Sequence, residues 1–158
     1  MIGRMACAVA AAALMAGCMA TSKKESPLAA EPVSQELAGL GPIGDAALPE
    51  KSCGMILWTL EGSTPTPVFR YVSGEKAEVN VNGAIVTLVR ADYSGASGYG
   101  VSERQHFESA GGLRMDVSAR FGLGFNGGAY LEQGLIKLEN DAGWSLITPA
   151  AGIAGCRN

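Results

Sequence analysis

The chain has 158 residues, with 12 basic and 15 acidic side chains and a formal net charge of −3 at pH 7. Its lysines and arginines are spread singly apart from Lys23 and Lys24, so it lacks the clustered basic face that a nucleic-acid partner requires. Apart from the N-terminal segments, the chain is long enough for one domain with a single core.

The first segment reads MIGRMACAVAAAALMAGC. Arg4 is its only charge, an apolar run follows from residue 5 to 14, and the small residues Ala16 and Gly17 come next, which is the layout of a secretory signal. A run of this length is too short to cross a bilayer, which takes about 20 residues. We therefore expect residues 1–17 to be an export signal.

The stretch LMAGC, residues 14–18, resembles the lipobox of bacterial lipoproteins. In that family the cysteine is diacylated and becomes the first residue of the mature chain, so the resemblance implies lipidation at Cys18. Acyl chains anchor a protein without a membrane span. Met19 stands where an aspartate would favour the inner membrane, and this implies an outer-membrane lipoprotein facing the periplasm. The alternative is an ordinary secretory signal with an incidental cysteine.

Residues 18–52 contain four prolines and no aromatic residue. Such a stretch buries too little apolar surface to offset the entropy of ordering it. The sequence predicts a flexible tether over 18–52 and a folded domain over 53–158.

After Cys53 the chain alternates short apolar runs with turn residues, which is typical of an all-β fold. We expect about eight antiparallel strands, closing into a small barrel or a tight sandwich. They lie near residues 55–60, 68–72, 77–81, 84–91, 101–108, 113–121, 129–139 and 144–148.

The turns support this scheme. Asn82-Gly83 lies between alternating runs and predicts a two-residue type I′ hairpin. The stretches 110–112, 126–128 and 140–143 separate later strands, and Gly134 predicts a bulge.

Cys53 and Cys156 are the two cysteines that remain after Cys7 leaves with the signal and Cys18 carries lipid. In an oxidising compartment they have only one possible pairing. Since the first and last strands of an antiparallel barrel are often neighbours, we expect a disulfide that joins the two ends of the domain.

Catalytic and metal-binding motifs are scarce. His106 is the only histidine, and strand alternation places it with Arg104 and Glu108 on a solvated face rather than in a triad. One histidine and two paired cysteines cannot supply a zinc site, and residues 139–143 lack the spacing of a calcium loop. We expect no catalytic residue, no metal and no cofactor.

The stretch DYSGASGYG, residues 92–100, is the best candidate for a binding loop. Tyrosine, serine and glycine give contact area and adaptable hydrogen bonds at low entropic cost. The candidate residues are Tyr93, Ser94, Ser97 and Tyr99; a plain hairpin connection is the alternative.

Residues 94–99, SGASGY, are also similar to a loop of the membrane-bound inhibitors of C-type lysozyme, with the tyrosine displaced by one place and without that family's second characteristic stretch. The main expectation is a lipid-anchored, non-enzymatic envelope module that binds an envelope protein or a cell-wall partner or fills a structural role. The alternatives are a periplasmic inhibitor of C-type lysozyme and a hydrolase acting on cell wall or lipid.

Overall fold

The computed structural model describes residues 37–59 and 64–158. The signal peptide, Cys18 and the first part of the tether lie outside these residues. The described part contains strands and no helices, and so no helix that could cross a membrane. Its strands are β1 Leu40–Gly41, β2 Ser52–Thr59, β3 Thr66–Val72, β4 Ala77–Val81, β5 Ala84–Gly98, β6 Val101–Glu108, β7 Arg114–Phe125, β8 Gly128–Glu139 and β9 Ser145–Arg157.

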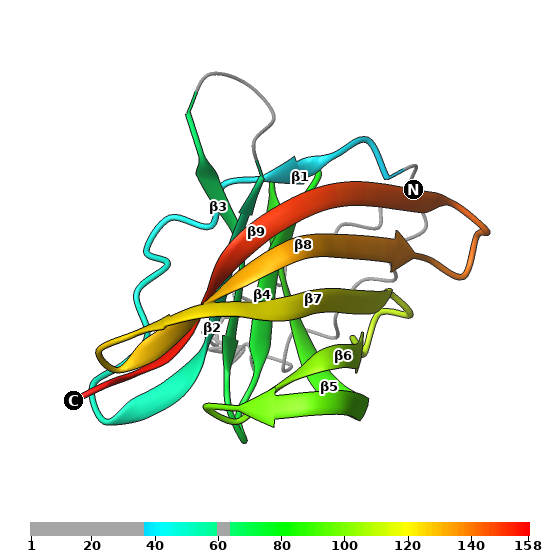
Figure 1. Cartoon of the computed structure of the whole chain (residues 1–158). Helices are drawn as coiled ribbons and strands as arrows, with labels where there is room; N and C mark the ends of the chain where they lie inside the picture. The colour runs from blue at the N-terminus through cyan, green and yellow to red at the C-terminus, as the bar shows by residue number, and fades with distance from the viewer. Residues whose placement is uncertain (1–36, 60–63) are drawn as a thin grey trace, which may run out of the picture.

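The strands form one antiparallel sheet that closes on itself (Figure 1). Its order is β1-β4-β3-β2-β9-β8-β7-β6-β5, and pairing between β4 and β5 completes the ring. Strands β2 to β9 are thus an eight-stranded barrel, and β1 adds to β4 from outside. The all-β prediction is confirmed, and of the two predicted architectures the structure has the barrel rather than the sandwich.

Strand alternation fills the barrel interior. Leu113, just before β7, and Met115 and Val117 on β7 point inward and are buried, as the sequence pattern predicts. The largest interior side chains include three aromatic rings in edge-to-face contact. The centroid of the Phe107 ring lies 5.4 Å from that of Phe69 and 5.2 Å from that of Tyr71. Edge-to-face contact is a favourable arrangement of aromatic rings, so these residues form the centre of the core.

The predicted Asn82-Gly83 hairpin is confirmed. Both residues have positive φ, 53° and 85°, as a type I′ turn requires. The register of β8 against β9 shifts between Leu131 and Gly134, which confirms the predicted bulge.

Cys53 and Cys156 form the predicted disulfide, and their Cα atoms are 3.9 Å apart. They are directly opposite one another where β2 pairs with β9. The first and last barrel strands are therefore neighbours, as expected, and the bridge joins two strands that are also joined by backbone hydrogen bonds.

Several strands are longer than the sequence predicts. β9 continues to Arg157, although residues 149–158 were expected to follow the last strand. This region is rich in alanine and glycine, which have low strand propensity, but it pairs with β8 on one side and β2 on the other. Two-sided pairing overrides the local preference.

Residues 37–51, which we call the strap, differ from the flexible tether expected through residue 52. Leu37, Ile43 and Leu48 are buried, and Leu37 belongs to the main core. Arg70 on β3 donates hydrogen bonds to the carbonyls of Asp45 and Ala47. The strap runs along the outside of the barrel from β1 to the start of β2, in cyan in Figure 1. A few well-spaced apolar side chains are enough to dock it.

Candidate functional site

A depression of about 290 Å³ lies on the outer face of β5, β6 and β7, and we call it the outer groove. It is lined by Asp92, Tyr93, Ser94, Arg104, Gln105, His106, Asp116, Val117 and Ser118. Strand pairing arranges its polar side chains in two rows across the sheet. Asp92, His106 and Asp116 form one row, and Ser94, Arg104 and Ser118 form the next.

The shape of β5 helps to form this groove. β4 pairs with β5 only as far as Leu88, so among the described strands the rest of β5 is paired with β6 alone. The register of β5 against β6 shifts between Arg90 and Asp92 and again between Ser94 and Ser97. Bulges increase local twist and redirect side chains, so this hairpin departs from the regular barrel wall.

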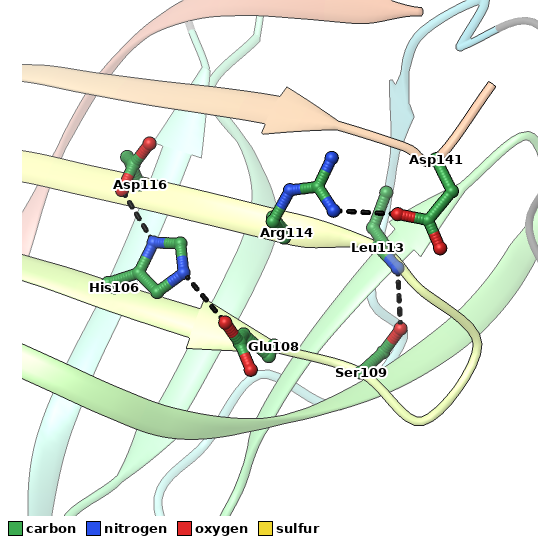
Figure 2. Close-up of polar contacts among 7 residues, drawn as sticks. All are labelled: His106, Glu108, Ser109, Leu113, Arg114, Asp116 and Asp141. Carbon is green, nitrogen blue, oxygen red and sulfur yellow. Dashed lines mark hydrogen bonds and ion pairs between the residues drawn. The ribbon is translucent and has the colours of Figure 1, made fainter. Parts of the chain in front are cut away.

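His106 is held between two carboxylates (Figure 2). Its Nδ1 lies 2.7 Å from Oδ1 of Asp116 on β7, and its Nε2 lies 3.2 Å from Oε1 of Glu108 on its own strand. The hydrogen bond to Asp116, and then that to Glu108, raise the pKa of His106 above its usual 6.5 against the opposing effect of partial burial. The arrangement favours the imidazolium, which donates from both ring nitrogens.

The contacts of His106 within the described residues include no hydrogen bond to a hydroxyl. A base needs a free ring nitrogen facing the hydroxyl that it deprotonates. Both His106 ring nitrogens face carboxylates in the described structure. The Ser94 hydroxyl in the next row instead accepts a hydrogen bond from Arg104 Nε at 3.1 Å. His106 thus lies among charged side chains, with Arg104 and Glu108 on the same outer face, as predicted from alternation.

The four candidate loop residues do not form one site. The stretch expected to be a loop is the outer half of β5, and the true turn is only Tyr99-Gly100, with φ values of 56° and 74°. Tyr93 and Ser94 line the outer groove, whereas Ser97 Oγ lies 2.7 Å from the buried Ser102 Oγ. Glycine and serine suit bulged strands as well as loops, so composition alone could not separate the two.

Tyr93 is positioned by an arginine that sequence analysis did not single out. The Arg90 guanidinium carbon lies 4.4 Å from the Tyr93 ring centroid and 5.1 Å from that of Tyr71. Arg90 also donates to Gln105 Oε1 at 2.9 Å and to the carbonyl of Gly100 at 3.0 Å. These contacts hold an exposed tyrosine at the rim of the groove.

Asp92 and Asp116 were also missed as site residues. The contact of Asp116 with His106 depends on the β6–β7 register, which one sequence does not reveal.

Metal ligation has no support in the described residues, among which no group of three histidine, cysteine, aspartate or glutamate side chains could hold an ion. In the 139–143 turn, Asp141 Oδ1 instead accepts a hydrogen bond from Arg114 at 2.6 Å (Figure 2). The side-chain oxygens of Asn140 and Asp141 thus accept hydrogen bonds from Trp144 N within the hairpin and from Arg114 on β7.

No protein-family model matches the sequence, and no curated protein and no solved structure is significantly similar to it.

Proposed function

We propose that this protein is a lipid-anchored lipoprotein of the bacterial envelope whose barrel is a binding module, with the outer groove as its binding surface. The anchor would be Cys18, on the strength of LMAGC at residues 14–18, and the membrane would be the outer membrane, with the barrel facing the periplasm.

The observation that carries the binding role is the prearranged polar surface of the outer groove. His106 lies between the carboxylates of Asp92 and Asp116 in one row, and Arg104 lies between the hydroxyls of Ser94 and Ser118 in the next. Because strand pairing and mutual hydrogen bonds already hold several of these side chains, a partner would meet a rigid pattern and lose little entropy in ordering it. An envelope protein or a cell-wall polymer, both rich in polar groups, fits such a surface.

Site-directed photo-crosslinking in cells tests this role. A photoreactive residue is placed at Ser118, inside the outer groove, and at Ile85, which is 55% exposed on β5 but outside the groove. We expect a discrete adduct from position 118 and none from position 85. Equal labelling at both, or no adduct at 118, would remove the groove as the binding surface.

Inhibition of C-type lysozyme is the second candidate. It is favoured by the place of residues 94–99, which run along the outer half of β5 into the Tyr99-Gly100 turn. Purified protein added to a lysozyme assay should slow lysis if this candidate is right, and Tyr99→Ala should weaken the effect. Lysis at an unchanged rate would reject it and leave the wider binding role in place.

A further inference from the structure

We propose that the tip of the β7–β8 hairpin, residues 121–131, inserts into the lipid surface to which Cys18 anchors the chain. The proposal rests on the proposed function for that anchor but concerns a different surface from the outer groove. Three large apolar side chains are exposed at this tip: Leu123 at 78%, Phe125 at 41% and Tyr130 at 50%.

Two of the three exposed apolar side chains pack against each other and so present one apolar surface. The Phe125 and Tyr130 rings pack with centroids 5.2 Å apart. A Cβ on Gly128 would lie 2.5 Å from Phe125 Cζ, so the glycine leaves room for the Phe125 ring to lie against the sheet. Tyr130 is directly opposite the half-buried Ile153 of β9, which extends the apolar surface to the next strand.

The absence of charged residues within the tip favours a lipid partner over a typical protein partner. No charged residue occurs between Arg120 and Glu132, and these two residues are paired across the strands. Within residues 121–131 only Asn126 and the Tyr130 hydroxyl are polar, while the Glu132 carboxylate lies over Gly122 and Arg157 follows Cys156 beside the turn. Apolar contact therefore dominates at the tip itself, with charged groups only at its margin. Leucine, phenylalanine and tyrosine are the kinds of residue that favour the membrane interface.

Part of the tip backbone also suits lipid. Phe125 pairs with Gly128 across a two-residue turn, and Cys156 N donates to the carbonyl of Gly127 at 3.0 Å. Unpaired backbone groups are costly in an apolar medium, and here β9 supplies a partner even to a turn carbonyl. At the tip, β8 pairs with both β7 and β9, whereas β7 beyond Ser118 pairs with β8 alone and its register shifts between Phe121 and Gly124. The β8 arm is therefore the part of the tip best suited to an apolar environment.

The anchor can reach the same surface as the tip. The described chain begins at the opposite barrel end, where Ala38 N donates to Asn82 in the β4–β5 turn. The 12 residues of β8 extend about 40 Å along the strand at ~3.4 Å each, and since barrel strands are tilted this is an upper limit for the barrel length. The chain between Cys18 and Leu37 can span at most roughly 60 Å, so one bilayer can hold the acyl chains and contact the tip.

Single-tryptophan fluorescence tests the proposal on the full acylated chain. Trp58 and Trp144 are replaced by phenylalanine, and one tryptophan is introduced as Leu123→Trp or, as the matched control, Ile85→Trp on the exposed face of β5. The proteins are reconstituted in phosphatidylcholine vesicles with brominated acyl chains. We expect a blue shift and loss of emission for Leu123→Trp and unchanged emission for Ile85→Trp.

A second arm separates this proposal from the proposed function. The full chain with Cys18→Ser is held on the vesicle by an N-terminal histidine tag and a nickel-chelating lipid, so that no acyl chain on the protein is needed. Quenching of Leu123→Trp, but not Ile85→Trp, in this arm supports insertion even if the natural protein proves not to be acylated. Emission from Leu123→Trp that vesicles leave unchanged, or quenching equal to that of the control, overturns the proposal in either arm and assigns the tip to a protein partner.

Discussion

Removing the Cys53–Cys156 disulfide should lower the thermal stability of the barrel without opening it. The bridge closes a loop with a sequence separation of 103. For a loop of about 100 residues, the chain-entropy relation gives roughly 4.7 kcal/mol at 25 °C, and disulfides in practice contribute about 2–4 kcal/mol. For a domain of this size, 1 kcal/mol corresponds to about 4 °C in Tm, so the expected fall is roughly 8–16 °C.

The assay compares thermal unfolding of the native protein with that of the Cys53→Ser/Cys156→Ser double variant, followed by far-ultraviolet circular dichroism. The variant should keep the β-sheet spectrum at low temperature, because β2 and β9 remain paired from Ser52 to Trp58. Adding reductant should lower the Tm of the native protein to that of the variant and leave the variant unchanged. An unchanged Tm after loss of the bridge would refute the argument from loop entropy, and loss of the sheet spectrum would refute closure by strand pairing.

Three further perturbations follow from the structure. Gly83→Ala should reduce the free energy of unfolding by about 1 kcal/mol, because φ is +85° there, whereas Gly39→Ala, with open space and no positive φ, should change it little in the same denaturant titration. Leu37→Ala should cost about 2–4 kcal/mol, since this strap residue is buried in the core; a cost near zero would mean that the strap is not docked. His106, the single histidine, should titrate above its usual pKa of 6.5 by nuclear magnetic resonance, and Asp116→Asn should lower that pKa. Because the pKa is raised in the folded state, the stabilisation is complete below the unfolded-state pKa and is lost as pH rises through the folded value, so the stability gap between native protein and Asp116→Asn should narrow at alkaline pH.

Local patterns predicted the hairpins and the inner faces of the strands. Asn82-Gly83 encodes its turn directly, because few other residue pairs accept positive φ at both places. The alternation from Leu113 to Phe121 likewise reveals which side of β7 faces the interior. The pairing of Cys53 with Cys156 followed from counting cysteines and from the closure of an antiparallel barrel.

Long-range packing accounts for what the sequence did not reveal. The strap contains two prolines and no aromatic residue, and its docking includes a β3 arginine that donates to its carbonyls. The outer half of β5 has loop-like composition but is paired with β6 around its bulges. His106 could be placed on an outer face, while its partner Asp116 required the register of two strands. Residues that act through a distant partner are thus the hardest to identify from one sequence.

Mass spectrometry of the N-terminal peptide of the protein purified from membranes tests the central claim most directly. The account predicts that the peptide begins at Cys18 and carries a diacylglyceryl group on its thiol, and that a Cys18→Ser variant yields no acylated peptide. A mature chain that begins elsewhere, or that carries Cys18 as a free thiol, would contradict the account of this protein as an anchored envelope module.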